Sequence, residues 1–288
     1  MSSLQEKMAN RFVVTSELVP PKGTNLDTLL QTARSLEKYV DAFNVTDSHA
    51  AHMSLSPIAA AHTLISEGFE PILQMVTRDR NRIAIQSDML GASLLGITNL
   101  VCMGGDPPNV GDHPHAKPVF DLSTAELIHA AFTLNSGNDE VGHKLSQSTD
   151  FHIGAVVNPG SSDLGTEIKR MEEKVEAGAT FFQTQAIYDV RSFVDFINSI
   201  EHLNVTIIAG VMPIKSVKMA EYANNNIPGI HIPDWMIQRI ANADDIKETS
   251  VQLAAELISE LAPFCGGVHL MALGAEDRIP LILDRARR

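Results

Sequence analysis

Eight apolar runs alternate with segments of helical periodicity along the chain, and this alternation most limits the possible fold. The runs lie at residues 12–19, 40–46, 71–77, 98–103, 151–157, 180–185, 205–211 and 267–272. Each run is short and almost continuously apolar, which is typical of a strand covered on both faces in a parallel sheet. Eight strand–helix units in 288 residues predict an α/β protein, with a single (β/α)₈ barrel over residues 1–288.

The segments between the runs carry apolar residues at helical spacing. Helices are expected near residues 25–38, 57–67, 81–95, 124–134, 163–177, 190–200, 216–224, 233–241 and 244–261, with a further helix at the C-terminal end. Asn25 is the expected N-cap of the first of these, and residues 134–148 are expected to form a loop insertion. A doubly wound open sheet is the alternative fold. No GxGxxG follows the first run and no GxxxxGK[ST] occurs, which argues against that alternative.

The charge balance argues against nucleic-acid binding. Asp and Glu number 35 against 22 Lys and Arg, for a net charge of −13, and the basic residues cluster only at the C-terminal end. No apolar run approaches the roughly 20 residues of a membrane span, and the N-terminal segment lacks the apolar stretch of a signal peptide. We therefore expect a cytoplasmic protein that contacts neither nucleic acid nor a membrane. Cys102 and Cys265 form no CxxC pair, which argues against a structural zinc site or a disulfide framework.

Polar residues gather where the predicted strands stop, and barrels of this type build their active sites at those ends. The strand ends carry Glu17, Thr46, Asp47, Thr77, Arg78, Gly105, Asp106, Asn158 and Gln185. A plainer interpretation is that every strand simply ends in a polar loop. The barrel prediction requires these residues to converge on one face of the molecule.

Glu17 is the strongest candidate because it lies inside an otherwise apolar strand. Burial there would desolvate the carboxyl and raise its pKa toward the range of a general acid. A solvent-facing residue or a buried salt bridge is the structural alternative. Asp106 follows two glycines, which allow close approach to a ligand, but it could equally be a turn residue before two prolines.

Two histidine groups have competing interpretations. His49 and His52 could hydrogen-bond a cofactor or cap a helix. His113 and His115 lie one residue apart in a proline-rich loop, where solvated side chains are more common than ligands, so no metal site is predicted. Lys174 on the fifth helix is, by spacing alone, a solvated lysine.

Several motifs in register along nearly the whole chain resemble the methylenetetrahydrofolate reductase family. Glu17 stands just before a Pro-Pro pair, Val45-Thr46 resembles the second-strand motif, and residues 77–82 read TRDRNR, which is similar to one bacterial subgroup. The remaining motifs are GDPP at 105–108, KVEAGA at 174–179, QTQ at 183–185, GVMP at 210–213 and IPDW at 232–235. No single motif is decisive, but their order and number make the resemblance specific.

This resemblance implies a flavin-carrying barrel that reduces 5,10-methylenetetrahydrofolate to 5-methyltetrahydrofolate. By position, Glu17 matches the acid that protonates N10, Asp106 matches the residue that binds the pterin near the flavin, and Gln185 matches the glutamine that contacts folate. The resemblance also assigns Thr46 and Lys174 to the flavin, with Lys174 facing its phosphate. The remaining expected cofactor-binding positions are Asp47, His49, Thr77, Arg78, Gly105, Asp106, Asn158 and Ser162.

The chain departs from the family at flavin-binding positions. Gly104 stands where the family has arginine, Gln74 where it has histidine, and Asn158 where it has tyrosine. Arg78, Asn158 and Ser162 could substitute for these residues. FAD is therefore the expected cofactor and FMN the alternative.

The electron donor and the partners stay open at this stage. NADH, NADPH or the redox centre of a partner subunit could reduce the flavin, and we expect a homo-oligomer. Two rival functions are a pterin-binding methyltransferase barrel without flavin and a non-catalytic barrel subunit of a larger complex.

Overall fold

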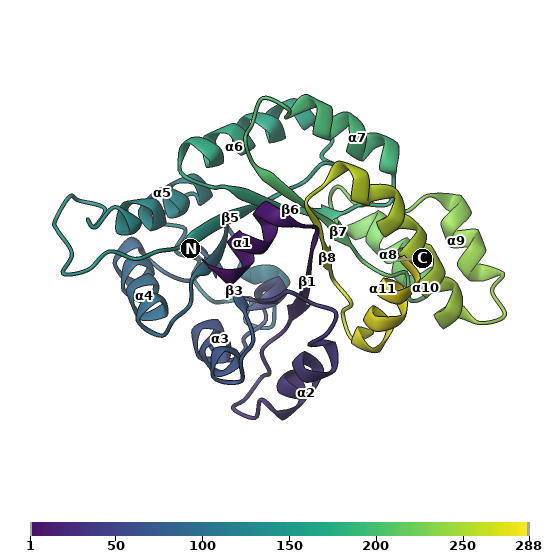
Figure 1. Cartoon of the computed structure of the whole chain (residues 1–288), viewed down its shortest axis with the longest axis horizontal. Coiled ribbons are helices and arrows are strands. Elements are labelled where there is room, and N and C mark those ends of the chain that lie inside the picture. Colours follow the sequence, from purple (N-terminus) through teal and green to yellow (C-terminus); the bar gives the residue numbers. More distant parts are fainter. Residues whose placement is uncertain (1, 287–288) are drawn as a thin grey trace.

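The computed structural model describes residues 2–286 as a closed parallel barrel surrounded by helices, which confirms the predicted fold class (Figure 1). The strands follow one another around the barrel in chain order, and β1 pairs with β8 to close it. Their bounds are β1 Val13–Leu18, β2 Ala42–Val45, β3 Pro71–Val76, β4 Asn99–Met103, β5 His152–Val157, β6 Phe181–Ala186, β7 Thr206–Val211 and β8 Gly267–Leu270. Each lies within, or one residue beyond, an apolar run of the sequence.

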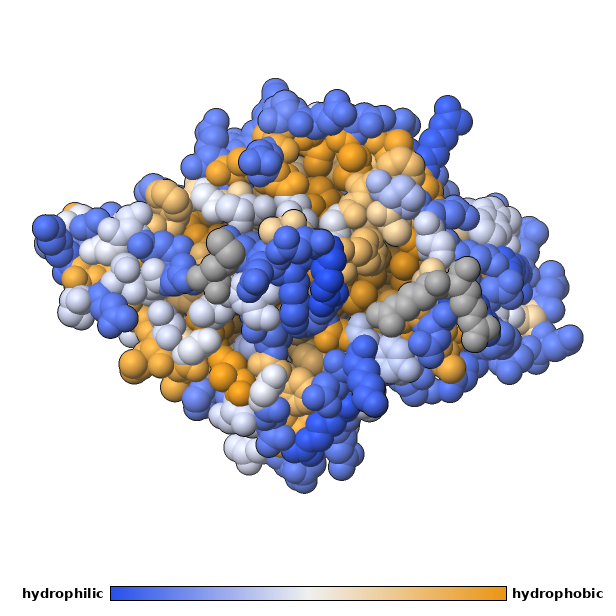
Figure 2. Space-filling view, in the orientation of Figure 1, coloured by the Kyte–Doolittle hydropathy of each residue, from blue (hydrophilic) through white to orange (hydrophobic). Residues whose placement is uncertain are grey.

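Helices cover the outside of the barrel, so each strand is buried on both faces, as the continuous apolar runs indicated. The helices are α1 Ser3–Asn10, α2 Asp27–Leu36, α3 Pro57–Ser66, α4 Arg82–Leu94, α5 Thr124–Asn135, α6 Leu164–Glu176, α7 Val190–Ser199, α8 Val217–Asn226, α9 Asp234–Ala241, α10 Ile246–Leu261 and α11 Ile279–Ala286. Short 3₁₀ helices are η1 His49–Ala51, η2 Pro108–Val110, η3 Ala262–Phe264 and η4 Glu276–Arg278. Figure 2 shows that the face seen there is mostly polar, with apolar residues visible between the helices.

Helix α1 was not expected from the sequence, and it lies across the end of the barrel where the strands begin (Figure 1). Leu4 is fully buried and packs with Val13, Ile72 and Phe181 inside the barrel, at the end where the strands begin. The Ser2 hydroxyl caps the helix and also donates to Asn99 Oδ1 at 2.6 Å. This end of the barrel is therefore plugged by apolar packing.

The expected N-cap at Asn25 is wrong by one position. Helix α2 begins at Asp27, and Leu26 occupies the cap position without a side-chain cap. The Asn25 side chain instead accepts a hydrogen bond from the Asp27 amide at 2.7 Å, which forms a turn before the helix. The insertion at 134–148 is confirmed as mostly irregular after the end of α5 at Asn135. In the described chain, no helix combines the length and the apolar character that crossing a membrane requires.

Candidate active site at the carboxyl ends of the strands

The barrel brings the predicted residues to one end of the molecule. Glu17 and Gln185 are the next-to-last residues of β1 and β6, and Thr46 and Asn158 directly follow β2 and β5. Asp106 follows β4 after two glycines. Because all eight strands are parallel in one closed barrel, these positions share its carboxyl end. The predicted convergence on one face is confirmed.

The Glu17 carboxyl lies between two histidines. Its side chain is 10% exposed, with Oε1 3.9 Å from His49 Nδ1 and Oε2 4.0 Å from His269 Nε2. Burial alone would raise the pKa of Glu17, which is what the sequence led us to expect. The proximity and charge of His269, with smaller contributions from His49 and Gln74, outweigh burial and lower that pKa. The expected raised pKa is therefore wrong for the ligand-free protein, and Glu17 is held there as a carboxylate.

His269 and Thr15 belong to the side chains around Glu17, and neither was predicted from the sequence. The Thr15 hydroxyl lies 2.9 Å from His269 Nδ1, and both side chains are almost completely buried. This contact fixes the ring so that its other nitrogen faces Glu17. A lone histidine inside the apolar strand 267–270 was the available signal, and Thr15 shares a strand face with Glu17 because side chains alternate.

Replacing His269 with alanine should raise the pKa of Glu17. The folded-state pKa lies below the ordinary value, so ionised Glu17 stabilises the fold above that ordinary value. This contribution is lost as the pH falls through the lowered folded pKa, and the substitution should move the loss to higher pH. Carbon-13 NMR of the Glu17 carboxyl during a pH titration measures the shift. His202→Ala is the control, because His202 pairs with Glu172 on the surface; an unchanged Glu17 titration in His269→Ala would contradict the assignment.

A pair of amides spans the barrel interior between opposite strands. Asn44 Nδ2 donates to Gln183 Oε1 at 2.6 Å, and Gln183 Nε2 donates to Asn44 Oδ1 at 3.0 Å. Both side chains are buried, and 139 positions separate them in sequence. Each amide thus supplies the hydrogen-bond partners of the other. Asn44 and Gln183 precede Thr46 and Gln185 by two residues each, so the pair forms a polar layer deeper in the barrel.

Thr46 offers an unused hydrogen-bonding group at the mouth of the barrel. In the described part of the chain, its buried Oγ1 has no hydrogen-bond partner. A buried hydroxyl left unpaired costs free energy, so such an atom at a strand end is expected to meet a ligand. This observation fits the expected cofactor-binding role of Thr46.

The Asp47 carboxylate is occupied by contacts within the protein. Its carboxylate accepts hydrogen bonds from Arg80 Nη1 at 2.6 Å, Arg80 Nη2 at 3.0 Å and the Val76 amide at 3.0 Å. With its side chain only 2% exposed, both oxygens are occupied inside the protein. Asp47 therefore joins the ends of β2 and β3, and its side chain has little capacity left for a cofactor.

Arg78, Thr77 and Gly105 form the adjoining wall. The Arg78 side chain is 3% exposed and donates to the Asp106 carbonyl at 3.3 Å and to the Ser48 carbonyl at 3.4 Å. Its Nε binds the Asp79 carboxylate, and the Thr77 side chain is also buried. Gly105 has φ +86°, and a Cβ there would lie 3.0 Å from Val76 Cβ, so a larger residue would disturb the wall. The Asp106 residue itself is exposed.

The residues beyond β5 are less directly available than expected. The Asn158 side chain donates to the Pro228 carbonyl at 3.1 Å and accepts from the Gly160 amide at 3.2 Å, which ties two loops together. Ser162 is exposed in the following loop. Lys174 Nζ donates to the Val156 carbonyl at 2.8 Å, and burial lowers its pKa. Lys174 is therefore not the solvated lysine that its spacing suggested.

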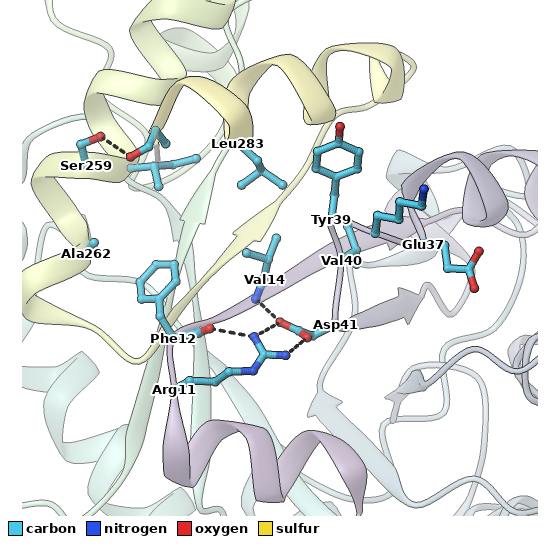
Figure 3. Close-up of a pocket in the computed structure, with 13 residues that line it drawn as sticks. Arg11, Phe12, Val14, Glu37, Tyr39, Val40, Asp41, Ser259, Ala262 and Leu283 are labelled. Atoms are coloured by element: carbon cyan, nitrogen blue, oxygen red, sulfur yellow. Dashed lines mark hydrogen bonds and ion pairs between the residues drawn. The ribbon is translucent and has the colours of Figure 1, made fainter. Parts of the chain in front are cut away.

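Two pockets lie at opposite ends of the barrel. A groove of about 470 Å³ reaches Glu17 and is also lined by Val19, Leu273 and Glu276. Figure 3 shows a second hollow of about 380 Å³ near the other end of the barrel, where Arg11 points to Asp41. The Asp41 carboxylate also accepts from the Val14 amide at 3.0 Å, and none of the predicted site residues lines this hollow. Features at that end of a barrel commonly serve stability.

Over residues 2–286, no cluster of three or more His, Cys, Asp or Glu side chains is arranged to hold a metal ion.

Comparisons with known proteins identify the family of the chain. The family described as methylenetetrahydrofolate reductase matches residues 3–287. Methylenetetrahydrofolate reductase 2 of Schizosaccharomyces pombe is 27% identical over 232 residues, which cover 74% of this chain and 35% of that protein. The 5,10-methylenetetrahydrofolate reductase of Pectobacterium carotovorum is 22% identical over 268 residues, covering 88% and 82%. The chain spans only about a third to a half of the first curated relatives that it matches.

Solved structures show the same fold. A Clostridium thermocellum protein described as binding two copies of 5-methyl-5,6,7,8-tetrahydrofolic acid superposes with a TM-score of 0.63 at 19% identity, over 99% of both chains. Tryptophan synthase of Mycobacterium tuberculosis superposes with a TM-score of 0.56 at 10% identity, over 99% of this chain and 95% of that one. At these identities the likeness concerns the fold alone.

Proposed function

Because this chain belongs to the methylenetetrahydrofolate reductase family, we propose that it reduces 5,10-methylenetetrahydrofolate to 5-methyltetrahydrofolate with a bound flavin. The observation that carries the proposal is the Glu17 carboxyl, which is almost buried at the barrel mouth and faces an imidazole on each oxygen. Such a group can store a proton and deliver it to a bound substrate. The family match explains why a folate would be that substrate.

The substrate needs a proton before it can accept a hydride. Protonation of N10 opens the five-membered ring and leaves an iminium cation at N5, and hydride addition to its carbon then gives the methyl group. Glu17 supplies the proton and returns to a carboxylate. The lowered pKa of free Glu17 does not oppose this role, because a bound substrate excludes water and disfavours the charged carboxylate.

A flavin bound at this mouth would supply the hydride. The residue that fits it best is Thr46, with its unused Oγ1. Gly105 would shape the wall beside it, because a side chain there would press on Val76. Arg78 and Lys174 bring positive charge to the same end and would favour an anionic group such as phosphate. Asp47 would act by holding Arg80 and the end of β3 in place rather than by contact.

Asp106 and Gln185 would position the folate. Asp106 is exposed beyond β4 and can accept hydrogen bonds from the amino group and ring N–H of a pterin. The Gln185 Oε1 accepts from the Ala186 amide at 3.0 Å, and within residues 2–286 its NH₂ group remains free to donate. FAD is the proposed cofactor and FMN the alternative, with NADH, NADPH or a partner subunit as the source of electrons.

Replacing Thr46 with valine should weaken flavin binding about fivefold to tenfold, because one hydrogen bond is commonly worth about 1 kcal/mol. The flavin-free protein should keep its stability or gain slightly, because the substitution removes a buried oxygen that has no partner in the described chain. Fluorescence titration with FAD and with FMN gives the affinities, and thermal unfolding gives the stability.

Ser250→Ala is the matched control for that experiment. Ser250 Oγ, on α10, is another buried hydroxyl without a partner in the described chain, and it lies outside the strand ends. Its removal should affect stability in the same way and leave flavin affinity unchanged. Equal affinities for Thr46→Val and the parent protein would contradict the role of Thr46. Parent protein that binds neither flavin would favour a pterin-binding methyltransferase.

A further inference from the structure

We propose that His49 relays a proton from solvent to Glu17 after each turnover and so acts on the substrate only through Glu17. This inference rests on the proposed reductase function. Each reduction consumes one proton at N10, so Glu17 must be reprotonated every cycle. Its side chain is only 10% exposed, which limits direct access of water to the carboxyl. A group that touches both Glu17 and solvent would remove this limit.

The two imidazoles beside Glu17 differ in their access to water. His269 is 4% exposed, and its Nδ1 is occupied by the Thr15 hydroxyl at 2.9 Å. His49 is 49% exposed, and its Nδ1 lies 3.9 Å from Glu17 Oε1. A movement of less than 1 Å would close this gap to a hydrogen bond, and such contacts often tighten only when substrate binds. The geometry makes His49 the solvent-side partner and His269 the buried one.

The backbone around His49 is strained in a way that holds this position. Ser48, Ala50 and Ala51 have φ values of 50°, 50° and 57°, in the left-handed region that residues other than glycine rarely adopt. Such strain persists only where surrounding contacts enforce it, and it is concentrated at functional sites. Three left-handed residues in four positions therefore indicate that the placement of His49 is built into the fold.

The enforcing contacts come from three neighbouring loops. Arg78 Nη2 donates to the Ser48 carbonyl at 3.4 Å. The chain at Gly111 passes so close to Ala51 that a Cβ there would lie 1.9 Å from the Ala51 carbonyl oxygen, so only glycine fits. Asp112 Oδ1 accepts from the Met53 amide at 3.0 Å, and its other oxygen pairs with Lys22.

The charged and titratable groups around this loop leave Glu17 as the partner of His49. Arg78 is held by Asp79, Asp47 is held by Arg80, and Asp112 is held by Lys22 and His113. His52, three residues along the same loop, has its Nδ1 2.9 Å from the Ala50 carbonyl and is also exposed. His52 therefore provides a matched histidine that makes no contact with Glu17.

The proton balance of the step is simple. A protonated His49 gives the proton on Nδ1 to Glu17 Oε1, which leaves a neutral imidazole and a neutral carboxylic acid. Glu17 gives that proton to N10 of the substrate and becomes a carboxylate again. His49 then takes a proton from water or from a buffer acid, so no further reactant is needed.

The test compares His49→Ala, His49→Gln and His52→Ala in weak buffer at neutral pH, by steady-state turnover and by flavin re-oxidation with methylenetetrahydrofolate. His49→Ala should lower kcat by at least about tenfold with little change in KM, as for loss of one proton-transfer group. Added imidazole should restore the rate of His49→Ala, which has room for it, and not that of His49→Gln. His52→Ala should match the parent with and without imidazole.

A second readout does not depend on turnover. In the flavin-free protein, His49→Ala should raise the pKa of Glu17 measured by carbon-13 NMR, because the charge of His49 contributes to lowering it. His52→Ala should leave it unchanged. A parental kcat in His49→Ala, or a loss that imidazole does not restore, would overturn the inference. Parent protein that cannot reduce the folate would instead overturn the proposed function, and an unchanged Glu17 titration would separately overturn the contact.

Discussion

Replacing Glu17 with glutamine should lower the rate of methylenetetrahydrofolate reduction by at least about 10²-fold, because an amide cannot donate the proton that opens the ring. The same variant should bind flavin and accept electrons from the donor at close to the parent rate, since that half-reaction needs no proton at N10. The side chains are nearly equal in size, so the barrel should remain folded. Folate can still bind, because the loss is in proton donation.

Stopped-flow absorbance of the flavin separates the two half-reactions. Glu276→Gln is the matched control, because Glu276 lines the same groove as Glu17 but lies beyond β8, in η4. It removes one negative charge from the groove and should leave both half-reactions unchanged. Re-oxidation of Glu17→Gln by methylenetetrahydrofolate at the parent rate would show that Glu17 is not the acid.

Replacing Asp47 with alanine should lower the free energy of unfolding by about 3 kcal/mol, the cost of leaving buried partners unpaired. The substitution removes the acceptor for two nitrogens of Arg80 and for the Val76 amide. Arg80 is 19% exposed and keeps Asp88, so the effect should lie at the lower end for a buried pair. Urea unfolding of the flavin-free protein measures it.

Asp88→Ala tests whether burial is the reason for the loss of stability expected in Asp47→Ala. Asp88 binds the same guanidinium at 2.9 Å, but its side chain is 38% exposed. Exposed pairs commonly contribute less than about 1 kcal/mol, so this variant should lose little stability. Equal losses in the two variants would mean that Asp47 has no special structural role and would return it to the set of candidate cofactor contacts.

Local patterns were sufficient to predict where the polar groups of the site would meet. Parallel strands in a closed barrel all end on one face, so residues that follow apolar runs must gather there. That reasoning placed Glu17, Thr46 and Gln185 together although they are far apart in sequence. It could not detect α1, because a short polar helix with one fully buried leucine has no clear apolar stripe.

The protonation and the hydrogen bonds of the site could not be predicted from local patterns. Glu17 in an apolar strand indicated a raised pKa, but its folded pKa depends on His269, which is contributed by the last strand. The Asn44–Gln183 pair and the Asp47–Arg80 pair likewise join residues whose separation in sequence carries no sign of contact. Hydrogen bonds of this kind depend on distances of a few tenths of an ångström, which spacing along a strand does not report.

The sequence by itself determined the barrel, the end at which the candidate site lies and the presence of an acidic residue there, because periodic burial and strand direction are local properties of the chain. Only the tertiary structure decided which side chains are already occupied and which remain available. Closure of β8 onto β1 brings His269 to Glu17, and the strained loop after β2 brings His49 to its other side. These contacts arise from barrel closure and loop packing, in which residues from distant segments share one space, and they set the charge of Glu17.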